Sequence, residues 1–158
     1  MSKVVAGFPG TGKSYLTRNG EYNTCDSDSS KFSWIVKDGV KVRNPLFVVE
    51  YIQHIKDMLK VHDIVFVSTH KEVLDALETN KLHHIIVYPA VSLKSEYMER
   101  YRRRGNDESF LDLMEKNFEN FVAQIEARED TSEYAVMLKL LKDETMESVI
   151  SHILAFPE

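Results

Sequence analysis

Eight residues near the N-terminus have the pattern G-x-x-x-x-G-K-[ST], the phosphate-binding loop (P-loop) of proteins that bind nucleoside triphosphates. The run is Gly7-Phe8-Pro9-Gly10-Thr11-Gly12-Lys13-Ser14. Its glycines let backbone N–H groups turn toward an anion, and the helix that follows adds the positive end of its dipole. The lysine supplies a mobile charge for the β- and γ-phosphates, and the hydroxyl after it binds Mg²⁺.

The segments on either side of this loop have the required character, because a short apolar run precedes it and a helical pattern follows it. We therefore expect ATP and Mg²⁺ as cofactors, with Ser14 as a metal ligand. The residues expected to contact the nucleotide are Gly7, Pro9, Gly10, Thr11, Gly12, Lys13, Ser14 and Tyr15.

Phosphoryl transfer also needs acidic groups to help hold the metal ion. No predicted strand ends in an apolar run followed directly by Asp, so the best candidates are Asp26 and Asp28, just past the second predicted strand. Alternate spacing places both carboxylates on the same side, facing the phosphates. We assign Asp26 to the metal and the acceptor, and Asp28 to the acceptor and catalysis, as a base or as an orienting group. The alternative is a solvated turn in which these residues bond to the local backbone.

Positive charge for the transferred group comes from a second cluster, Arg100, Arg102, Arg103 and Arg104. On a helix, Arg100 lies on the same face as Arg103 and Arg104, which are three and four residues further on. The planar guanidinium group binds two phosphate oxygens at once. We therefore predict catalytic roles for Arg100, Arg103 and Arg104 beside Lys13, against the alternative of a solvated helix face.

Aromatic and basic residues that could contact a small molecule follow the second predicted strand. Trp34, Phe32 and Tyr51 can enclose a base, and Arg43 can hold a phosphate because it stands beside a helix start, where a cation is unfavourable for the dipole. Packing of Trp34 and Phe32 against the core is the alternative.

Strands and helices alternate along the chain, which indicates an α/β fold with a parallel sheet covered on both faces. The expected strands are 3–6, 21–25, 63–68, 84–88 and 134–141, and the expected helices are 13–18, 45–60, 70–79, 92–104, 107–128 and 144–154, with 31–43 irregular. We expect Asn44 and Thr69 to cap the second and third helices. The candidate polar groups fall at the carboxyl ends of strands, where ligands bind in such sheets.

The composition sets limits on the function. The 158 residues are enough for one domain, residues 1–158, and the net charge of −5 does not favour binding of nucleic acid across the surface. The single cysteine, Cys25, fits a reducing compartment. No signal pattern occurs, and no segment approaches the ~20 apolar residues that cross a bilayer. We expect a cytoplasmic protein without a membrane partner and with a nucleotide or another small molecule as acceptor.

With its P-loop, its acceptor segment after the second strand and its arginine-bearing helix after the fourth, the chain resembles the nucleoside monophosphate kinases and related small P-loop kinases. Residues 26–55 are similar to phage-type deoxynucleoside monophosphate kinases and adenylate-kinase-like proteins, for which the compartment is the host cytoplasm. The resemblance implies a three-layer fold, a five-stranded sheet in the order 2-3-1-4-5, an acceptor-binding insert at about 29–60 and a short lid at about 92–107. Two features differ from the family: Ser68-Thr69-His70 replaces the usual Asp-Gly-x-Pro-Arg segment, and the lid is a helix rather than a subdomain.

Three functions follow from these residues. The leading one is transfer of the γ-phosphoryl group of MgATP to a nucleoside or deoxynucleoside monophosphate. The second is a kinase for a hydroxyl acceptor, such as a nucleoside, a sugar or a nucleic-acid end, with Asp26 or Asp28 as the base. The third is a nucleotide-dependent switch or binding module, which would need switch loops that the sequence does not indicate.

Overall fold

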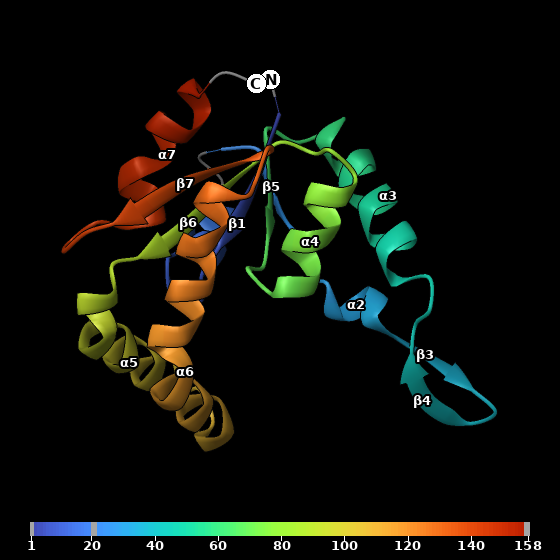
Figure 1. Ribbon diagram of the computed structural model, residues 1–158, viewed down its shortest axis with the longest axis horizontal. Coiled ribbons are helices and arrows are strands. Elements are labelled where there is room, and N and C mark those ends of the chain that lie inside the picture. Colours follow the sequence, from blue (N-terminus) through green and yellow to red (C-terminus); the bar gives the residue numbers. More distant parts are fainter. Residues whose placement is uncertain (1, 20–21, 157–158) are drawn as a thin grey trace.

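The centre of the molecule is a five-stranded parallel sheet in the order β2-β5-β1-β6-β7 (Figure 1). The computed structural model describes residues 2–19 and 22–156. The strands of this sheet are β1 Lys3–Gly7, β2 Thr24–Asp26, β5 Ile64–Val67, β6 His84–Pro89 and β7 Ala135–Leu140. An α/β fold with a five-stranded parallel sheet, as predicted, is therefore confirmed.

The strand order differs in its numbering from the expected 2-3-1-4-5. Two strands that were not expected, β3 and β4, lie between the second and third strands of the sheet and form a separate hairpin. The central strand is β1, paired with β5 on one side and β6 on the other, so the loop after β1 leaves from the middle of the carboxyl edge.

Helices cover both faces of the sheet. They are α1 Lys13–Asn19, α2 Ser30–Ser33, α3 Phe47–Leu59, α4 Lys71–Thr79, α5 Lys94–Arg103, α6 Glu108–Glu126 and α7 Met146–Ala155. Side chains alternate along β1, so Val4 and Ala6 join the core under α3, α4 and α6, whereas Val5 joins the core under α1 and α7. Figure 1 shows α7 on the opposite side of the sheet from α3 and α4.

Both predicted helix caps were wrong. The N-cap of α3 lies two residues after Asn44, and the N-cap of α4 lies one residue after Thr69. The Oδ1 atom of Asn44 does accept a hydrogen bond, from Leu46 N at 3.0 Å, but this bond closes a turn and α3 begins only at Phe47. The residue that precedes α4 is His70 rather than Thr69, and its side chain makes no capping bond. Helix α3 is stabilised instead by the packing of its buried face, which includes Ile52 and Ile55.

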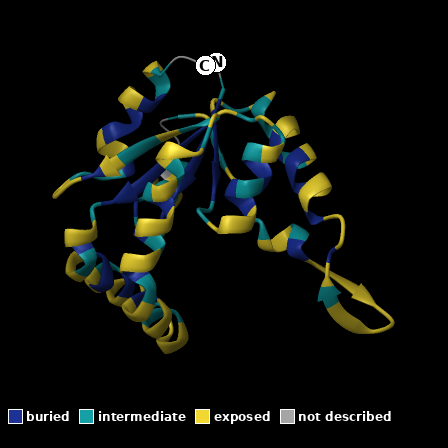
Figure 2. Cartoon of the chain, in the orientation of Figure 1, coloured by how far each residue is buried: buried dark blue, intermediate teal, exposed yellow. Residues whose placement is uncertain are grey.

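The segment 31–43, expected to be irregular, contains α2 and an antiparallel hairpin of β3 Trp34–Lys37 and β4 Val40–Arg43. Asp38 and Gly39 both have positive φ angles, 53° and 76°, as a two-residue hairpin turn requires. The hairpin projects from the body of the molecule (Figure 1) and is exposed along most of its length (Figure 2). Strands of four residues are too short for their alternation to stand out in a sequence.

The expected lid, 92–107, consists of a short 3-10 turn at Val91–Leu93 and α5. Tyr97, Met98 and Tyr101 bury the inner face of α5, which packs beside α6 and the loop after β1. Within the described part of the chain, no helix has the length and apolar character needed to cross a membrane.

Candidate functional site

The P-loop connects β1 to α1 in a conformation that depends on two glycines. Gly10 and Gly12 have φ angles of 89° and 101°, which side chains of L-residues rarely allow. At Gly10 a Cβ atom would also come within 2.9 Å of the Tyr101 ring. Gly10 and Gly12 are therefore needed for the backbone conformation, as the motif predicts, and Gly10 is also needed for space.

Three hydrogen bonds support the loop, two from other elements and one within it. The backbone N–H of Phe8 donates to the carbonyl oxygen of Val87 on β6 at 3.0 Å. Thr11 Oγ1 donates to the Phe8 carbonyl at 2.8 Å, and Met146 N, at the start of α7, donates to the Thr11 carbonyl at 2.8 Å. Thr11 is thus buried within the protein and supports the loop, and α7 contributes to the site, which the sequence did not indicate.

The ammonium group of Lys13 lies back along the loop and donates to the Gly7 carbonyl at 3.1 Å. Its burial lowers the pKa of Lys13 below the usual 10.5, and the positive charge of Arg104 acts in the same direction. The carboxylates of Asp26 and Asp28 oppose this shift in pKa. Asp26, Asp28 and Arg104 therefore all lie within the electrostatic reach of Lys13.

Asp26 and Asp28 both lie within the electrostatic reach of Lys13, and Asp28 also makes the local backbone bond that the alternative of a turn predicts. Ser14 Oγ lies 3.5 Å from Asp26 Oδ2, so the predicted pair of metal ligands from the P-loop and the second strand is brought together. Asp28 Oδ1 accepts a hydrogen bond from Ser30 N at 2.9 Å. This bond, followed by a bond to the Ser30 side chain, is the main reason that the pKa of Asp28 is lowered from 3.8, so the group is ionised at neutral pH.

Between the two carboxylates, Ser27 points the other way and is buried against α3. Its Oγ atom lies 3.0 Å from His54 Nε2, and its carbonyl oxygen accepts a 2.7 Å hydrogen bond from the Tyr51 hydroxyl. Tyr51 is completely buried. The predicted stacking of an acceptor base on Tyr51 does not fit this position, because the ring belongs to the core and its hydroxyl holds the backbone between Asp26 and Asp28. The second partner, His54, was not identified from the sequence.

Helix α5 contacts the P-loop through two side-chain hydrogen bonds, one from a tyrosine and one from an arginine. The Tyr101 hydroxyl donates to the Pro9 carbonyl at 2.7 Å, and Arg100 Nη1 donates to the Gly10 carbonyl at 3.0 Å. The Arg100 guanidinium also lies over the Tyr97 ring, 4.3 Å from its centre. Neither tyrosine was predicted to contact the loop, since spacing in the sequence cannot show which atom a hydroxyl will reach.

The arginines of α5 do not act as one group of three. Arg104 lies over the Tyr101 ring at 5.6 Å and influences Lys13. Arg103 instead points to the exposed side and pairs with Glu99 at 3.4 Å, as Arg102 does at 3.8 Å. The predicted grouping of Arg103 with Arg100 and Arg104 was therefore wrong, because 300° of rotation over three residues leaves Arg103 to one side, where Glu99 holds it.

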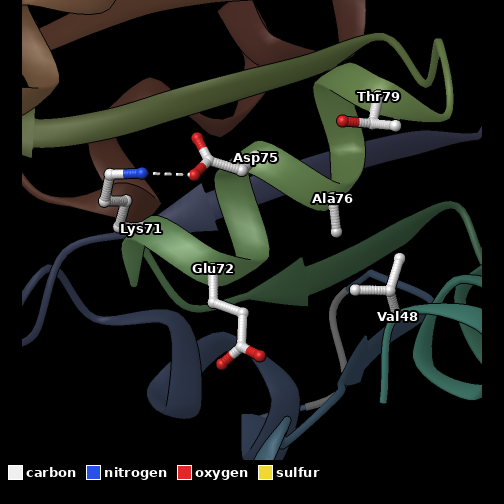
Figure 3. Close-up of a pocket in the computed structure, with 6 residues that line it drawn as sticks. All are labelled: Val48, Lys71, Glu72, Asp75, Ala76 and Thr79. Carbon is white, nitrogen blue, oxygen red and sulfur yellow. Dashed lines mark hydrogen bonds and ion pairs between the residues drawn. The ribbon is translucent and has the colours of Figure 1, made fainter. Parts of the chain in front are cut away.

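The two remaining acceptor residues lie on the hairpin. Arg43 forms a 2.6 Å ion pair with Glu72 on α4 and lies over the Trp34 ring at 5.1 Å. Glu72 also lines a surface hollow of about 500 Å³ between α3 and α4 (Figure 3), whose lining residues are Val48, Lys71, Glu72, Asp75, Ala76 and Thr79. The structure thus gives Arg43 a structural partner and ties the hairpin to α4, and the predicted binding of an acceptor phosphate by Arg43 stays a prediction.

Tyr15, the last predicted nucleotide contact, is on α1 with 48% of its surface exposed. Within residues 2–19 and 22–156, no three His, Cys, Asp or Glu side chains are grouped closely enough to hold a metal ion. A divalent ion at Ser14 and Asp26 would therefore need further oxygen ligands from elsewhere, as Mg²⁺ commonly takes from phosphates and water.

No protein family matches this sequence, and no curated protein matches it as a relative. Among solved structures, the tunicamycin resistance protein of Deinococcus radiodurans is similar, with a TM-score of 0.56 and 14% sequence identity. The similarity covers 98% of this chain and 94% of that one. At this level of identity the comparison shows a shared fold across the whole chain.

Proposed function

We propose that this protein is an ATP-dependent phosphotransferase, which moves the γ-phosphoryl group of MgATP to a nucleoside or deoxynucleoside monophosphate. The observation that carries the proposal is the 3.5 Å approach of Ser14 and Asp26 at the carboxyl edge of the sheet, beside Lys13, whose pKa responds to the charges of Asp26 and Arg104. A glycine loop with a lysine, a hydroxyl and a carboxylate at one edge fits a phosphate chain with its magnesium ion.

Each residue has a distinct task in this proposal. Ser14 and Asp26 hold the magnesium ion that accompanies the nucleotide, and Lys13 and Arg104 stabilise negative charge as the phosphoryl group moves. Arg100 keeps the loop in place through the Gly10 carbonyl, so its role is positioning. When bound, MgATP supplies the phosphoryl group, and the protein contributes orientation and charge.

A second candidate function is supported by Asp28. Its carboxylate is exposed and ionised at neutral pH, so it can accept a proton from a hydroxyl, although its lowered pKa makes it a weaker base than an ordinary Asp, and it lies within the electrostatic reach of Lys13. Arg43, the residue assigned to an acceptor phosphate, is already paired with Glu72. The structurally similar protein is named for resistance to tunicamycin, so small molecules with hydroxyl groups belong among the acceptors to be tested.

Mass analysis of the products tests the proposal directly. The purified protein is incubated with MgATP and, separately, with nucleoside monophosphates, nucleosides, tunicamycin and oligonucleotide ends. We expect a gain of one phosphoryl group on a monophosphate, in the wild type and not in Lys13→Ala. ATP consumption without a phosphorylated acceptor would contradict the proposal and favour a nucleotide-dependent switch.

The variant Asp28→Asn separates the two acceptor chemistries. A monophosphate acceptor already has a nucleophilic oxygen, so the loss of charge weakens only metal occupancy or orientation, and higher Mg²⁺ should restore much of the rate. A hydroxyl acceptor must lose a proton, which no metal concentration can replace. We expect rescue by Mg²⁺. A loss of several orders of magnitude at every Mg²⁺ concentration would instead establish the hydroxyl kinase.

A further inference from the structure

The β3–β4 hairpin carries an unusual number of exposed apolar side chains. Trp34, the single tryptophan of the chain, is 42% exposed, and Val36 and Val40 are 75% and 60% exposed. Most of the large aromatic side chains in the described residues are buried or partly buried in the two cores. Exposed apolar surface on a projecting element is typical of a contact site.

The hairpin also has a charge opposite to that of the whole protein. Residues 31–43 contain the cations Lys31, Lys37, Lys41 and Arg43 against one acid, Asp38, whereas the chain has a net charge of −5. The four cations are exposed. Such a reversal of sign, confined to one projecting segment, favours an anionic partner.

The strand register places the aromatic ring and two cations on one face. Trp34 lies opposite Arg43, and Val36 lies opposite Lys41, and directly opposed residues share a face of the hairpin. The Lys41 ammonium and the Arg43 guanidinium lie 5.2 and 5.1 Å from the centre of the Trp34 ring. The ion pair with Glu72 ties this face to α4, so the ring and its cations are presented on a supported surface.

We propose that this hairpin face binds single-stranded nucleic acid. The exposed part of the Trp34 ring offers a surface on which an unpaired base can stack, and Lys41, now over the ring, can move to a phosphate beside that base, while Arg43 stays paired with Glu72. A duplex keeps its bases stacked inside and offers the ring nothing to stack on, so single strands fit better. An acidic protein would match the cations but leave the aromatic face unused. The inference does not depend on phosphoryl transfer.

The single tryptophan makes the test direct, because fluorescence near 350 nm reports on Trp34 alone. Full-length protein without ATP is titrated with a single-stranded oligodeoxythymidylate, with a duplex of the same length, with a mononucleotide and with anionic lipid vesicles. We expect quenching by the single strand that weakens steeply with salt, by a slope of about 0.7 in log K per log salt for each phosphate contacted. Weaker quenching by the duplex and the mononucleotide would agree with this.

Two variants test the residues with a labelled oligonucleotide and fluorescence anisotropy. Trp34→Ala should raise the Kd about fivefold or more, as loss of one stacked base does. Lys41→Gln should raise the Kd and reduce the salt slope, whereas the control Lys60→Gln, an exposed lysine at the end of α3, should change neither. Circular dichroism verifies that each variant is folded, and Lys41→Gln keeps the test valid if Trp34→Ala does not fold.

Several results would overturn the inference. Equal quenching by a mononucleotide would make the hairpin part of a small-molecule site, and quenching only by vesicles would make it a membrane contact. A tryptophan signal that depends on protein concentration and not on oligonucleotide would make it a contact between copies of this chain. The absence of any quenching by the single strand at low salt would leave no nucleic-acid site.

Discussion

Arg103 and Arg104, at the end of α5, have different surroundings although they are neighbours in the sequence. Arg104 lies over Tyr101 and influences Lys13, whereas Arg103 pairs with Glu99 on the exposed side. The sequence pattern predicted the same catalytic role for both arginines. Replacing each of them by alanine therefore gives a matched pair of variants.

We expect Arg104→Ala to lower kcat by about tenfold to a thousandfold, because charge near the transferred group is lost, with less effect on the KM for ATP. Arg103→Ala should keep kcat within about twofold, since it loses only a surface ion pair. Steady-state kinetics with the acceptor identified by mass analysis makes the comparison. Equal losses in both variants would show that α5 acts as one cationic surface.

Lys13→Ala should reduce phosphoryl transfer by about two orders of magnitude or more, since a partner for developing charge is removed. Its stability should not fall. Burial depresses the pKa of Lys13, so below that pKa the charged group destabilises the folded state, and its removal relieves this cost. Kinetics and thermal melting of the same sample test both statements. Turnover near that of the wild type with a normal melting curve would remove the P-loop from the mechanism.

The loop between β1 and α1 is supported by the elements around it, and the Tyr101 ring of α5 leaves no room for a side chain at Gly10. Gly10→Ala combines an unfavourable φ angle with a Cβ atom 2.9 Å from the Tyr101 ring. Gly39→Ala, in the hairpin turn, has a similar positive φ but nothing within 4 Å. Gly39→Ala should lower the free energy of unfolding by roughly 1–2 kcal/mol. Gly10→Ala should lower it by more and should also abolish ATP binding. Urea unfolding measures the stability of both variants, and calorimetric titration measures their binding of ATP. Equal losses of stability would mean that α5 can shift to make room for a Cβ atom at residue 10.

The connection from β2 to α2 depends on α3, through the Tyr51 hydroxyl and the Ser27 carbonyl. Tyr51→Phe leaves that carbonyl without its donor and should cost about 1–3 kcal/mol. Because Asp26 and Asp28 flank Ser27, we also expect the Mg²⁺ concentration for half-maximal rate to rise. Tyr88→Phe is the control, since its hydroxyl contacts Glu126 on α6 instead. A loss of stability with an unchanged Mg²⁺ requirement would give Tyr51 a purely structural role.

At the scale of the whole molecule, the candidate site is assembled from distant segments, and among residues 2–19 and 22–156 no three His, Cys, Asp or Glu side chains are grouped to hold a metal ion. We expect Mg²⁺ alone to leave the melting temperature unchanged. MgATP at one hundred times its Kd should add about 2.7 kcal/mol, which corresponds to several degrees for a chain of this size. Thermal melting with Mg²⁺, ATP and both together measures this. A large shift with Mg²⁺ alone would reveal a metal site independent of the nucleotide.

Local pattern was enough to predict the parts of the site that depend on neighbours in the chain. The P-loop glycines, Lys13 and Ser14 follow from a motif whose backbone conformation is set within a few residues. The nearness of Asp26 and Asp28 to Lys13 follows from their position just past a predicted strand. The buried strands β5 and β6 follow from their apolar runs, because a parallel sheet covered on both faces needs apolar side chains throughout.

Tertiary contacts decided what those residues touch. Tyr51, Tyr101 and Arg43 have the types expected of ligand contacts, yet their hydroxyl or guanidinium groups bond within the protein, to Ser27, Pro9 and Glu72. These partners lie 24, 92 and 29 residues away in the chain, so no local spacing relates them. Whether a polar side chain serves a ligand or the fold depends on which segments the packing brings against it, and that packing is a property of the whole chain.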